Sequence, residues 1–306
     1  MRIGWGRLEK VGDVDQLWVV EGERATPVKA YSPELEPVCH DLSAFLASRG
    51  LDVLRARVGQ ERSGVSHRTE DIHWRAPISP QAKILCSAVN YVQHGAEAQI
   101  PPPSQPFLFV KLTSAVTGPY DPIPKPSVSE RMDYEAEWAV MIGAPVKNVA
   151  PEEALQYVAG YLVLNDLSFR DLQFDADHPD LRKSFGQNWL HGKGLDQACP
   201  AGPYLVTRDE VGDGPFRIRC WVNGTLVQDD TTDHMIYSAA QLVAYASRGI
   251  TLQPGDVIST GTPARLEAFG RRYLAAGDEL VTEVEGLGRL VNRIVDPLGS
   301  SASVTG

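Results

Sequence analysis

The segment RMDYEAEWAVMIG (residues 131–143) constrains the fold of this chain more than any other stretch. Its second half is an uninterrupted apolar run ended by a glycine, a pattern typical of a buried β-strand. Extended backwards, the predicted strand carries Asp133, Glu135 and Glu137 on one face, because side chains on a strand alternate between the two faces. Acids two residues apart on a strand lie about 7 Å from each other. Like charges held that close in a partly buried site need a counter-charge or a raised pKa.

Two interpretations fit these acids: a solvated edge strand, or a site where hard oxygen ligands bind a divalent metal ion. A third ligand would favour the metal site, and Asp166 is the candidate. It ends a second apolar strand pattern, YLVLND (residues 161–166), where an unpaired carboxylate would be costly. Three carboxylates with no histidine beside them favour Mg²⁺ or Mn²⁺ over zinc.

Short strand patterns separated by glycine and proline dominate the chain. Strands are predicted at residues 2–8, 16–22, 83–89, 107–112, 159–166, 216–222, 225–228, 257–263, 279–286 and 288–295. Helices are predicted at residues 42–50, 90–98, from 151 onwards and at 238–247. Asn223-Gly224 predicts a two-residue hairpin turn. The regular strand–helix alternation of a doubly wound sheet is missing, so the predicted fold class is mixed and β-dominated.

The segment APISP (residues 76–80) carries two prolines that neither a helix nor a central strand accommodates. We place a domain boundary there, with residues 1–75 as a small β-rich N-terminal domain and residues 76–306 as the larger domain. The tail after about residue 297, GSSASVTG at its end, is expected to be disordered.

Composition excludes several classes of protein. The net charge of −10 argues against a nucleic-acid partner, because phosphates would be repelled. The first residues lack a signal-peptide pattern, and no stretch is apolar for long enough to span a membrane, so no membrane association is expected. The four cysteines are scattered, which predicts reduced, buried thiols and a cytoplasmic location.

Six segments, in chain order, resemble the fumarylacetoacetate hydrolase superfamily over roughly residues 77–295. They are KILCSAVNYVQHGAE, MDYEAEWAVMIG, VAGYLVLNDLSFRDLQ, GKGLDQACPAGPYLVT, VNGTLVQ and GDVISTGTPA. The resemblance implies a β-roll or sandwich catalytic domain of that family behind a small N-terminal domain, usually in a homodimer. It also implies that Glu135, Glu137 and Asp166 bind Mg²⁺ or Mn²⁺.

His94 and Glu97 lie three residues apart in NYVQHGAE, so on a helix they share a face and the carboxylate can orient the imidazole. A lone histidine is more often structural. The resemblance favours function, because the family's N-Y-x-x-H-x-x-E segment carries a dyad that activates water. That segment often orders over the site, and the flanking Gly95 and prolines 101–103 are compatible with a mobile lid.

Further site residues are implied by the resemblance. Lys111 and Lys193 match lysines that line the site, and Lys193 is expected to stabilise negative charge as a catalytic residue. Lys111 and Thr262 are expected to bind substrate, the alternatives being a surface lysine and a turn residue. Arg170 and Asp171 are expected to support Asp166.

Two other histidines are weaker candidates. His178 lies in DADHPDLRK, which indicates an exposed loop, and His191 precedes Lys193. The chain also departs from the family: Ala88 replaces the usual glycine, GKGLD (residues 192–196) stands for G-K-S-F-D, and RLEAF (residues 265–269) replaces a glycine-rich stretch. The last change places bulk and charge beside the predicted pocket, so an unusual substrate is expected.

These residues lead to one hypothesis with two rivals. The leading hypothesis is a divalent-metal-dependent enzyme that cleaves a carbon–carbon bond in a small 2-oxo or 1,3-dicarbonyl acid, as an acylpyruvate or fumarylacetoacetate hydrolase does. The same enolate chemistry supports a decarboxylase or an isomerase. A catalytically idle ligand-binding protein is the remaining alternative, and it would be signalled by loss of a metal carboxylate or of the dyad, neither of which occurs.

Overall fold

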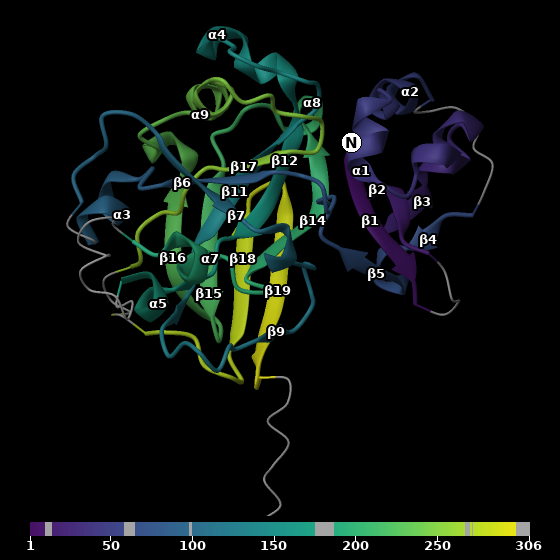
Figure 1. Ribbon diagram of the computed structural model, residues 1–306. Coiled ribbons are helices and arrows are strands. Elements are labelled where there is room, and N and C mark those ends of the chain that lie inside the picture. Colours follow the sequence, from purple (N-terminus) through teal and green to yellow (C-terminus); the bar gives the residue numbers. More distant parts are fainter. Residues whose placement is uncertain are drawn as a thin grey trace, which may run out of the picture.

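The computed structural model describes residues 1–9, 14–57, 65–97, 100–174, 187–266, 270 and 272–297. An N-terminal part lies to one side of a larger part built mainly from strands (Figure 1). The predicted fold class, mixed and β-dominated, is confirmed.

The strands are β1 (Arg2–Leu8), β2 (Gln16–Glu21), β3 (Arg24–Pro27), β4 (His67–Arg68), β5 (Ile72–Arg75), β6 (Ile84–Ala88), β7 (Phe107–Lys111), β8 (Val116–Thr117), β9 (Ile123–Pro124), β10 (Met132–Asp133), β11 (Ala136–Ile142), β12 (Val158–Asn165), β13 (Ser168–Phe169), β14 (Cys199–Thr207), β15 (Arg217–Val222), β16 (Thr225–Thr231), β17 (Val257–Ser259), β18 (Glu279–Val284) and β19 (Gly288–Val295). The α-helices are α1 (Leu42–Ala47), α2 (Gly50–Arg57), α3 (Val92–Glu97), α4 (Pro151–Ala154), α5 (Arg170–Phe174), α7 (Trp189–Lys193), α8 (Arg208–Val211) and α9 (Ala239–Ala246). Short 3-10 helices are η1 (Val28–Ala30), η2 (Pro33–Val38), η3 (Thr69–Asp71), η4 (Thr113–Ala115), η5 (Leu155–Tyr157) and η6 (Thr232–His234).

One large sheet runs through both parts of the molecule. Its strand order is β4-β3-β2-β1-β14-β12-β11-β17-β6-β7, with β5 paired to β1 and β8 paired to β14. A second sheet has the order β16-β15-β18-β19-β9, and β10 pairs with β13 in a short ladder of their own. The β1–β14 pairing joins the N-terminal strands to the larger part, and the predicted domain boundary at residues 76–80 stays a prediction.

The strands β11 and β12 form the buried centre of the large sheet. Every residue of both is buried, which accounts for their continuous apolar sequences. On β12, a Cβ at Gly160 would lie 2.1 Å from the Val206 carbonyl oxygen of β14. The glycine therefore permits the close approach of these two strands.

The strand predicted from Asp133 to Ile142 is interrupted, so that prediction is wrong in its first part. Residues up to Asp133 pair with β13, and β11 begins only at Ala136. Between them, the Glu135 amide donates to the side-chain Oδ1 of Asn165 at 3.0 Å instead of to a strand partner. The Asn165 side chain thus replaces the backbone acceptor that a continuous strand pairing would offer to the Glu135 amide.

The helix predicted at residues 42–50 ends at Ala47, and a second helix, α2, begins at Gly50. Arg49 has a φ of 61°, a left-handed conformation that ends the first helix, and Gly50 begins α2. A Cβ at Gly50 would lie 2.2 Å from the Phe45 ring, so glycine here permits packing rather than ending the helix.

Several local predictions are confirmed. Asn223-Gly224, with φ of 50° and 75°, turns β15 into β16. The helix predicted at residues 238–247 is α9, which Ser238 and Gln241 cap reciprocally. The strand predicted at residues 257–263 is too long: it ends at Ser259, and the Gly261 amide donates to the Glu137 side chain.

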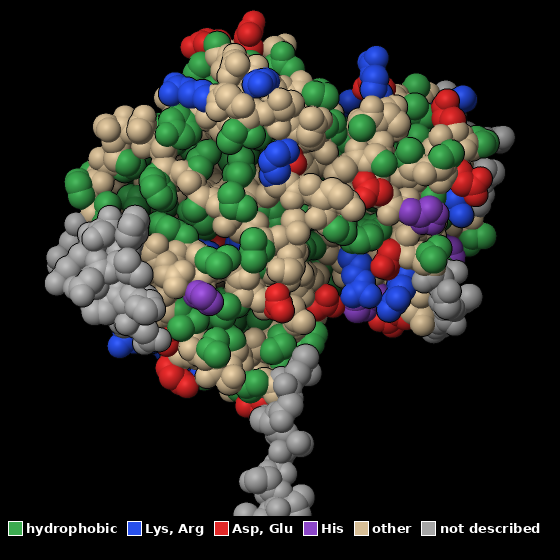
Figure 2. All heavy atoms as spheres, in the orientation of Figure 1, with side chains coloured by type: hydrophobic (Ala, Val, Ile, Leu, Met, Phe, Trp, Pro, Cys, Tyr) green, Lys and Arg blue, Asp and Glu red, His purple; other side chains and the backbone are tan. Residues whose placement is uncertain are grey.

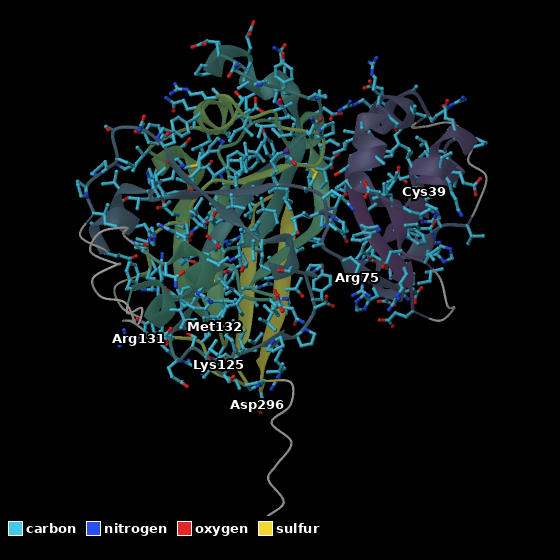
Figure 3. All side chains as sticks on the ribbon, viewed as in Figure 1. Cys39, Arg75, Lys125, Arg131, Met132 and Asp296 are labelled. Carbon is cyan, nitrogen blue, oxygen red and sulfur yellow. The ribbon has the colours of Figure 1, made fainter. Side chains whose placement is uncertain are left out.

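All four cysteines are unpaired and buried, as predicted, and Figure 3 places Cys39 in the N-terminal part. Among the described residues, no helix combines the length and apolar composition that a membrane span requires. The tail predicted to be disordered, residues 298–306, lies outside the described residues.

Candidate functional site

Three buried carboxylates meet at one end of β11 and β12. Glu137 lies on β11, Glu135 precedes that strand, and Asp166 directly follows β12. The strands are antiparallel, and the Asp166 amide donates to the Glu135 carbonyl oxygen at 2.9 Å. Each residue is at most 4 % exposed, and one carboxylate oxygen from each lies within 4.8 Å of the others. The three acids singled out from the sequence thus form one cluster, which we call the acidic triad.

Two buried lysines contact the triad. Lys193, at the end of α7, donates to Glu135 and to Asp166 Oδ2, the latter at 2.7 Å. Lys111, at the end of β7, donates to Asp166 Oδ1 at 2.6 Å and to the Leu167 carbonyl oxygen at 2.9 Å. The Lys111 side chain is 0 % exposed, so its ammonium is buried beside Asp166. This contact orients Asp166, and the expectation that Lys111 binds substrate stays a prediction.

Glu137 is held differently from its neighbours. Its Oε2 accepts hydrogen bonds from the Ser259 hydroxyl and from the Gly261 amide, the latter at 2.9 Å. Burial, followed by the negative charges of Asp166 and Glu135, raises the pKa of Glu137 to about 8. The Glu137 carboxyl group therefore keeps its proton at neutral pH unless a positive charge arrives.

The pKa of Glu135 is shifted in the opposite direction. Burial raises its pKa, but the charges of Arg170 and Lys193 outweigh burial and hold the pKa well below its ordinary value. Burial also opposes the charged form of Lys193, and Asp166 and Glu135 outweigh it, so the pKa of Lys193 is raised. Glu135 and Lys193 are therefore both charged near neutral pH.

The acidic triad fits a divalent cation. Its donors are carboxylate oxygens, the ligands that Mg²⁺ and Mn²⁺ prefer. Glu137 makes no hydrogen bond through Oε1 to any residue in the described part of the chain, which leaves that oxygen as a ligand. A cation between the three acids would relieve the repulsion that raises the pKa of Glu137.

His94 and Glu97 form the predicted pair on α3. His94 Nδ1 lies 3.1 Å from Glu97 Oε2, and Glu97 Oε1 accepts from the Arg265 amide at 2.8 Å. The His94 side chain is 20 % exposed. The imidazole is thus oriented through one nitrogen, and Nε2 is the nitrogen left for proton transfer.

Two adjoining cavities connect this pair with the triad. A small one of about 60 Å³ is lined by the three acids, Lys193, Thr262 and His94. A larger one of about 570 Å³ is lined by His94, Glu97, Arg170 and Arg265 among others. His94 borders both, so a molecule that reaches from the triad into the larger cavity would pass the imidazole.

Two arginines and Asp133 form a network that the sequence did not reveal. Asp133, fully buried, accepts from Arg170 Nε at 2.8 Å and from Arg265 Nη2 through the same oxygen. Arg170 also donates to Glu135 and to Gln173, the latter at 3.0 Å. The expectation that Arg170 and Asp171 support Asp166 is therefore wrong: Arg170 supports Glu135.

Asp171 instead accepts from the Ser129 hydroxyl at 2.6 Å and the Glu130 amide at 2.7 Å, in the segment that leads to β10. Figure 3 places Arg131 and Met132, the next residues, at the lower end of the larger part. The spacing of Arg170 and Gln173 by one helical turn was the available sequence signal for their contact.

Thr262 lies in the wall of the small cavity. Its hydroxyl donates to the Ala136 carbonyl oxygen at 2.9 Å and accepts from Gln228 Nε2 at 2.9 Å. Gln228 in turn accepts from the Ala136 amide at 3.0 Å. Thr262 thus fixes the start of β11, and its expected contact with substrate stays a prediction.

Of the two weaker histidine candidates, only His191 lies among the described residues. His191 contacts Asn188, the cap of α7, at 3.2 Å and is not among the residues that line either cavity. His178 lies outside the described residues.

Comparison with known proteins agrees with this fold. The family "Fumarylacetoacetate (FAA) hydrolase C-terminal" matches residues 83–295, and the chain belongs to this family of enzymes. The chain is 43 % identical to "Oxaloacetate tautomerase fahd2, mitochondrial" of Xenopus laevis over 282 residues, which are 91 % of this chain and 85 % of that protein.

Solved structures show the same architecture. The fumarylacetoacetate hydrolase of Exiguobacterium antarcticum superposes with a TM-score of 0.75 at 31 % identity, covering 96 % of this chain and 99 % of that one. A 5-carboxymethyl-2-hydroxymuconate delta-isomerase from Mycobacterium smegmatis superposes with a TM-score of 0.72 at 28 % identity, covering 97 % and 99 %. The predicted family is therefore confirmed, and its members carry names of hydrolases, isomerases and tautomerases.

Proposed function

We propose that this chain is a divalent-metal-dependent enzyme that forms and reprotonates the enolate of a small 2-oxo acid, as in keto–enol tautomerisation of oxaloacetate. The observation that carries this proposal is the acidic triad with a histidine–glutamate pair across the adjoining cavity. Support also comes from the relative named an oxaloacetate tautomerase, which matches most of the chain.

Glu135, Glu137 and Asp166 would hold the metal, with Mg²⁺ or Mn²⁺ the proposed ion. When bound, the ion would polarise the 2-oxo carbonyl and offset the negative charge of the enolate. Lys111 and Arg170 keep Asp166 and Glu135 in place, each through a charge-assisted hydrogen bond.

The proton transfer falls to His94. With Glu97 on Nδ1, its Nε2 can take a proton from the substrate C3 carbon and return it to the enolate oxygen or to carbon. Lys193, close to both Glu135 and Asp166, adds positive charge on the side where the enolate oxygen forms. The chain thus supplies a base, an orienting acid and a cationic wall.

Hydrolytic carbon–carbon cleavage of an acylpyruvate- or fumarylacetoacetate-like acid is the second candidate. The specific observation that favours it is the oriented imidazole at the mouth of a cavity of about 570 Å³, which has room for a water and a longer acyl chain. Decarboxylation needs the same enolate without the attacking water. A catalytically idle binding protein would retain the metal and turn over none of these acids.

One NMR experiment separates these candidates. Oxaloacetate, an acylpyruvate and a hydroxy-diene diacid are incubated with the protein and Mg²⁺ in D₂O, and products are identified by class. The proposal expects deuterium at C3 of oxaloacetate with the carbon skeleton intact, above the rate of a buffer blank with Mg²⁺. Cleavage products from the acylpyruvate would select the second candidate, and no reaction of any acid would reject both.

We also propose that the protein is a homodimer. Figure 2 shows hydrophobic side chains gathered on the visible face of the larger part. Five large hydrophobic side chains are exposed on or beside β7, α7 and α3: Val92, Phe107, Val110, Leu112 and Leu190. A second copy would remove them from water. Light scattering should give about twice the chain mass of 33.4 kDa, and a monomer at micromolar concentration would reject this.

The proposed setting is cytoplasmic, with no nucleic acid or membrane as a partner. The four buried thiols are compatible with a reducing compartment. The tautomerase of Xenopus laevis is named a mitochondrial protein, so fractionation of the source cells is the test of location.

A further inference from the structure

Resting on the proposed function, we propose that Arg265 selects 2-oxo acids that carry a second carboxylate, at C4, over acids of the same length with an apolar end. Arg265 would bind that carboxylate in the larger cavity while the 2-oxo acid end lies at the triad. The ligand class is therefore a short 2-oxo dicarboxylate.

The place of Arg265 in the cavities supports this. His94 borders both cavities, and Arg265 lines the larger one. A substrate whose C3 carbon lies at His94 has its first two carbons at the triad. Its C4 group then points into the cavity that Arg265 lines.

The guanidinium of Arg265 has N–H groups that make no hydrogen bond to a described residue. Among the described residues, the guanidinium donates through Nη2 to Asp133 and also interacts with the Tyr134 side chain. Its Nε is shut off from solvent and has no acceptor. Nη1 donates to no residue in the described part of the chain, so it is the nitrogen left to bind a carboxylate in the larger cavity; a guanidinium carries five N–H groups in a planar fork suited to carboxylates.

The neighbouring arginine is more fully engaged. All three nitrogens of Arg170 are engaged: Nε with Asp133 at 2.8 Å, Nη1 with Gln173 at 3.0 Å and Nη2 with Glu135. Of these two arginines, Arg265 is the one left to receive a new anion.

Arg265 is also held in place before any ligand binds. Its side chain is 12 % exposed, and its guanidinium carbon lies 5.5 Å from the centre of the Tyr134 ring. A fixed guanidinium loses little conformational freedom when it binds an anion, which favours selectivity. The chain departs here from the glycine-rich stretch common in the family, so the charge is a feature of this sequence.

The backbone of Arg265 allows recognition to be separated from catalysis. Its amide donates to Glu97 Oε1 at 2.8 Å, and a side-chain substitution keeps that bond. Arg265→Met removes the charge and the fork but keeps an unbranched side chain. In this variant Asp133 still accepts the hydrogen bond from Arg170 Nε.

The test compares two acids that differ only at C4: oxaloacetate, with a carboxylate, and 2-oxobutanoate, with a methyl group. Deuterium exchange at C3 is followed by NMR with Mg²⁺, and blank rates are subtracted. Wild type should favour oxaloacetate. Arg265→Met should raise the KM for oxaloacetate about 10- to 100-fold and change that for 2-oxobutanoate less than about threefold. Arg265→Lys, which keeps the charge without the fork, should fall between.

Arg289→Met is the matched control, because Arg289 is half exposed on β19 and is not among the residues that line either cavity. It should leave both KM values unchanged. Equal effects of Arg265→Met on the two acids, or none on oxaloacetate, would overturn the inference. If wild type exchanges neither acid, the proposed function itself fails, which is a different result.

Discussion

The acidic triad predicts that replacing Glu135 or Glu137 by glutamine changes stability in different ways. In Glu137→Gln the shape is kept and a buried carboxyl with a pKa of about 8 is replaced by a neutral amide. A carboxyl group whose folded pKa exceeds its unfolded value stabilises the fold below the unfolded pKa, and that stabilisation is lost as the pH rises through the folded pKa. For Glu137 this window runs from the ordinary value of 4.5 to about 8.

The magnitude follows from the linkage between proton binding and folding. Between pH 5.5 and pH 8 the wild-type protein without metal should lose about 3 kcal/mol relative to Glu137→Gln, at roughly 1.4 kcal/mol per pH unit. Urea unfolding in EDTA at the two pH values measures this difference. Adding Mg²⁺ at pH 8 should restore stability to the wild type and not to the variant, because the variant lacks one ligand.

Glu135→Gln is the matched control, since burial there is outweighed by Arg170 and Lys193. Removing the Glu135 charge leaves Arg170 and Lys193 each with one anionic partner fewer. The fold should be destabilised by about 1–3 kcal/mol at both pH values. A stability difference between wild type and Glu137→Gln that does not change with pH would refute this account of the triad.

Three further outcomes are expected. Because burial raises the pKa of Glu137 to about 8, Mg²⁺ binding should release most of a proton at pH 7 and little at pH 9, as calorimetry in buffers of different ionisation enthalpy measures; pH-independent release would contradict the assignment of Glu137 as a ligand. His94→Ala should lower kcat for C3 exchange by about 10²- to 10⁴-fold and leave the Mg²⁺-induced rise in Tm unchanged; retained turnover would remove His94 as the base. Gly160→Ala should destabilise the fold by at least about 2 kcal/mol, because a Cβ would lie 2.1 Å from the Val206 carbonyl oxygen; an unchanged urea midpoint would contradict the close approach of β12 and β14.

The sequence predicted those features that depend on local pattern. The buried strand β11 and the hairpin at Asn223-Gly224 follow from an apolar run and from turn chemistry. The acids of the triad were found because carboxylates beside apolar strands are unusual. Each of these signals lies within a few residues of the feature that it predicts.

Features that depend on contacts between distant segments were missed or misread. The interruption before Ala136 depends on Asn165, which supplies an acceptor from the neighbouring strand. Asp133 received no role because its partners, Arg170 and Arg265, are 37 and 132 residues away. The contact between Lys111 and Asp166 was also missed, because the two residues are 55 positions apart; the expected substrate contact of Lys111 stays a prediction.

The most direct measurement of the central claim follows the conversion of the enol form of oxaloacetate to the keto form, through loss of the ultraviolet absorbance of the enol. The rate is compared for wild type with Mg²⁺, wild type in excess EDTA, and Glu137→Gln with Mg²⁺. A triad that holds the metal predicts acceleration over the Mg²⁺ blank only in the first case. Full acceleration in EDTA, or by Glu137→Gln, would contradict it.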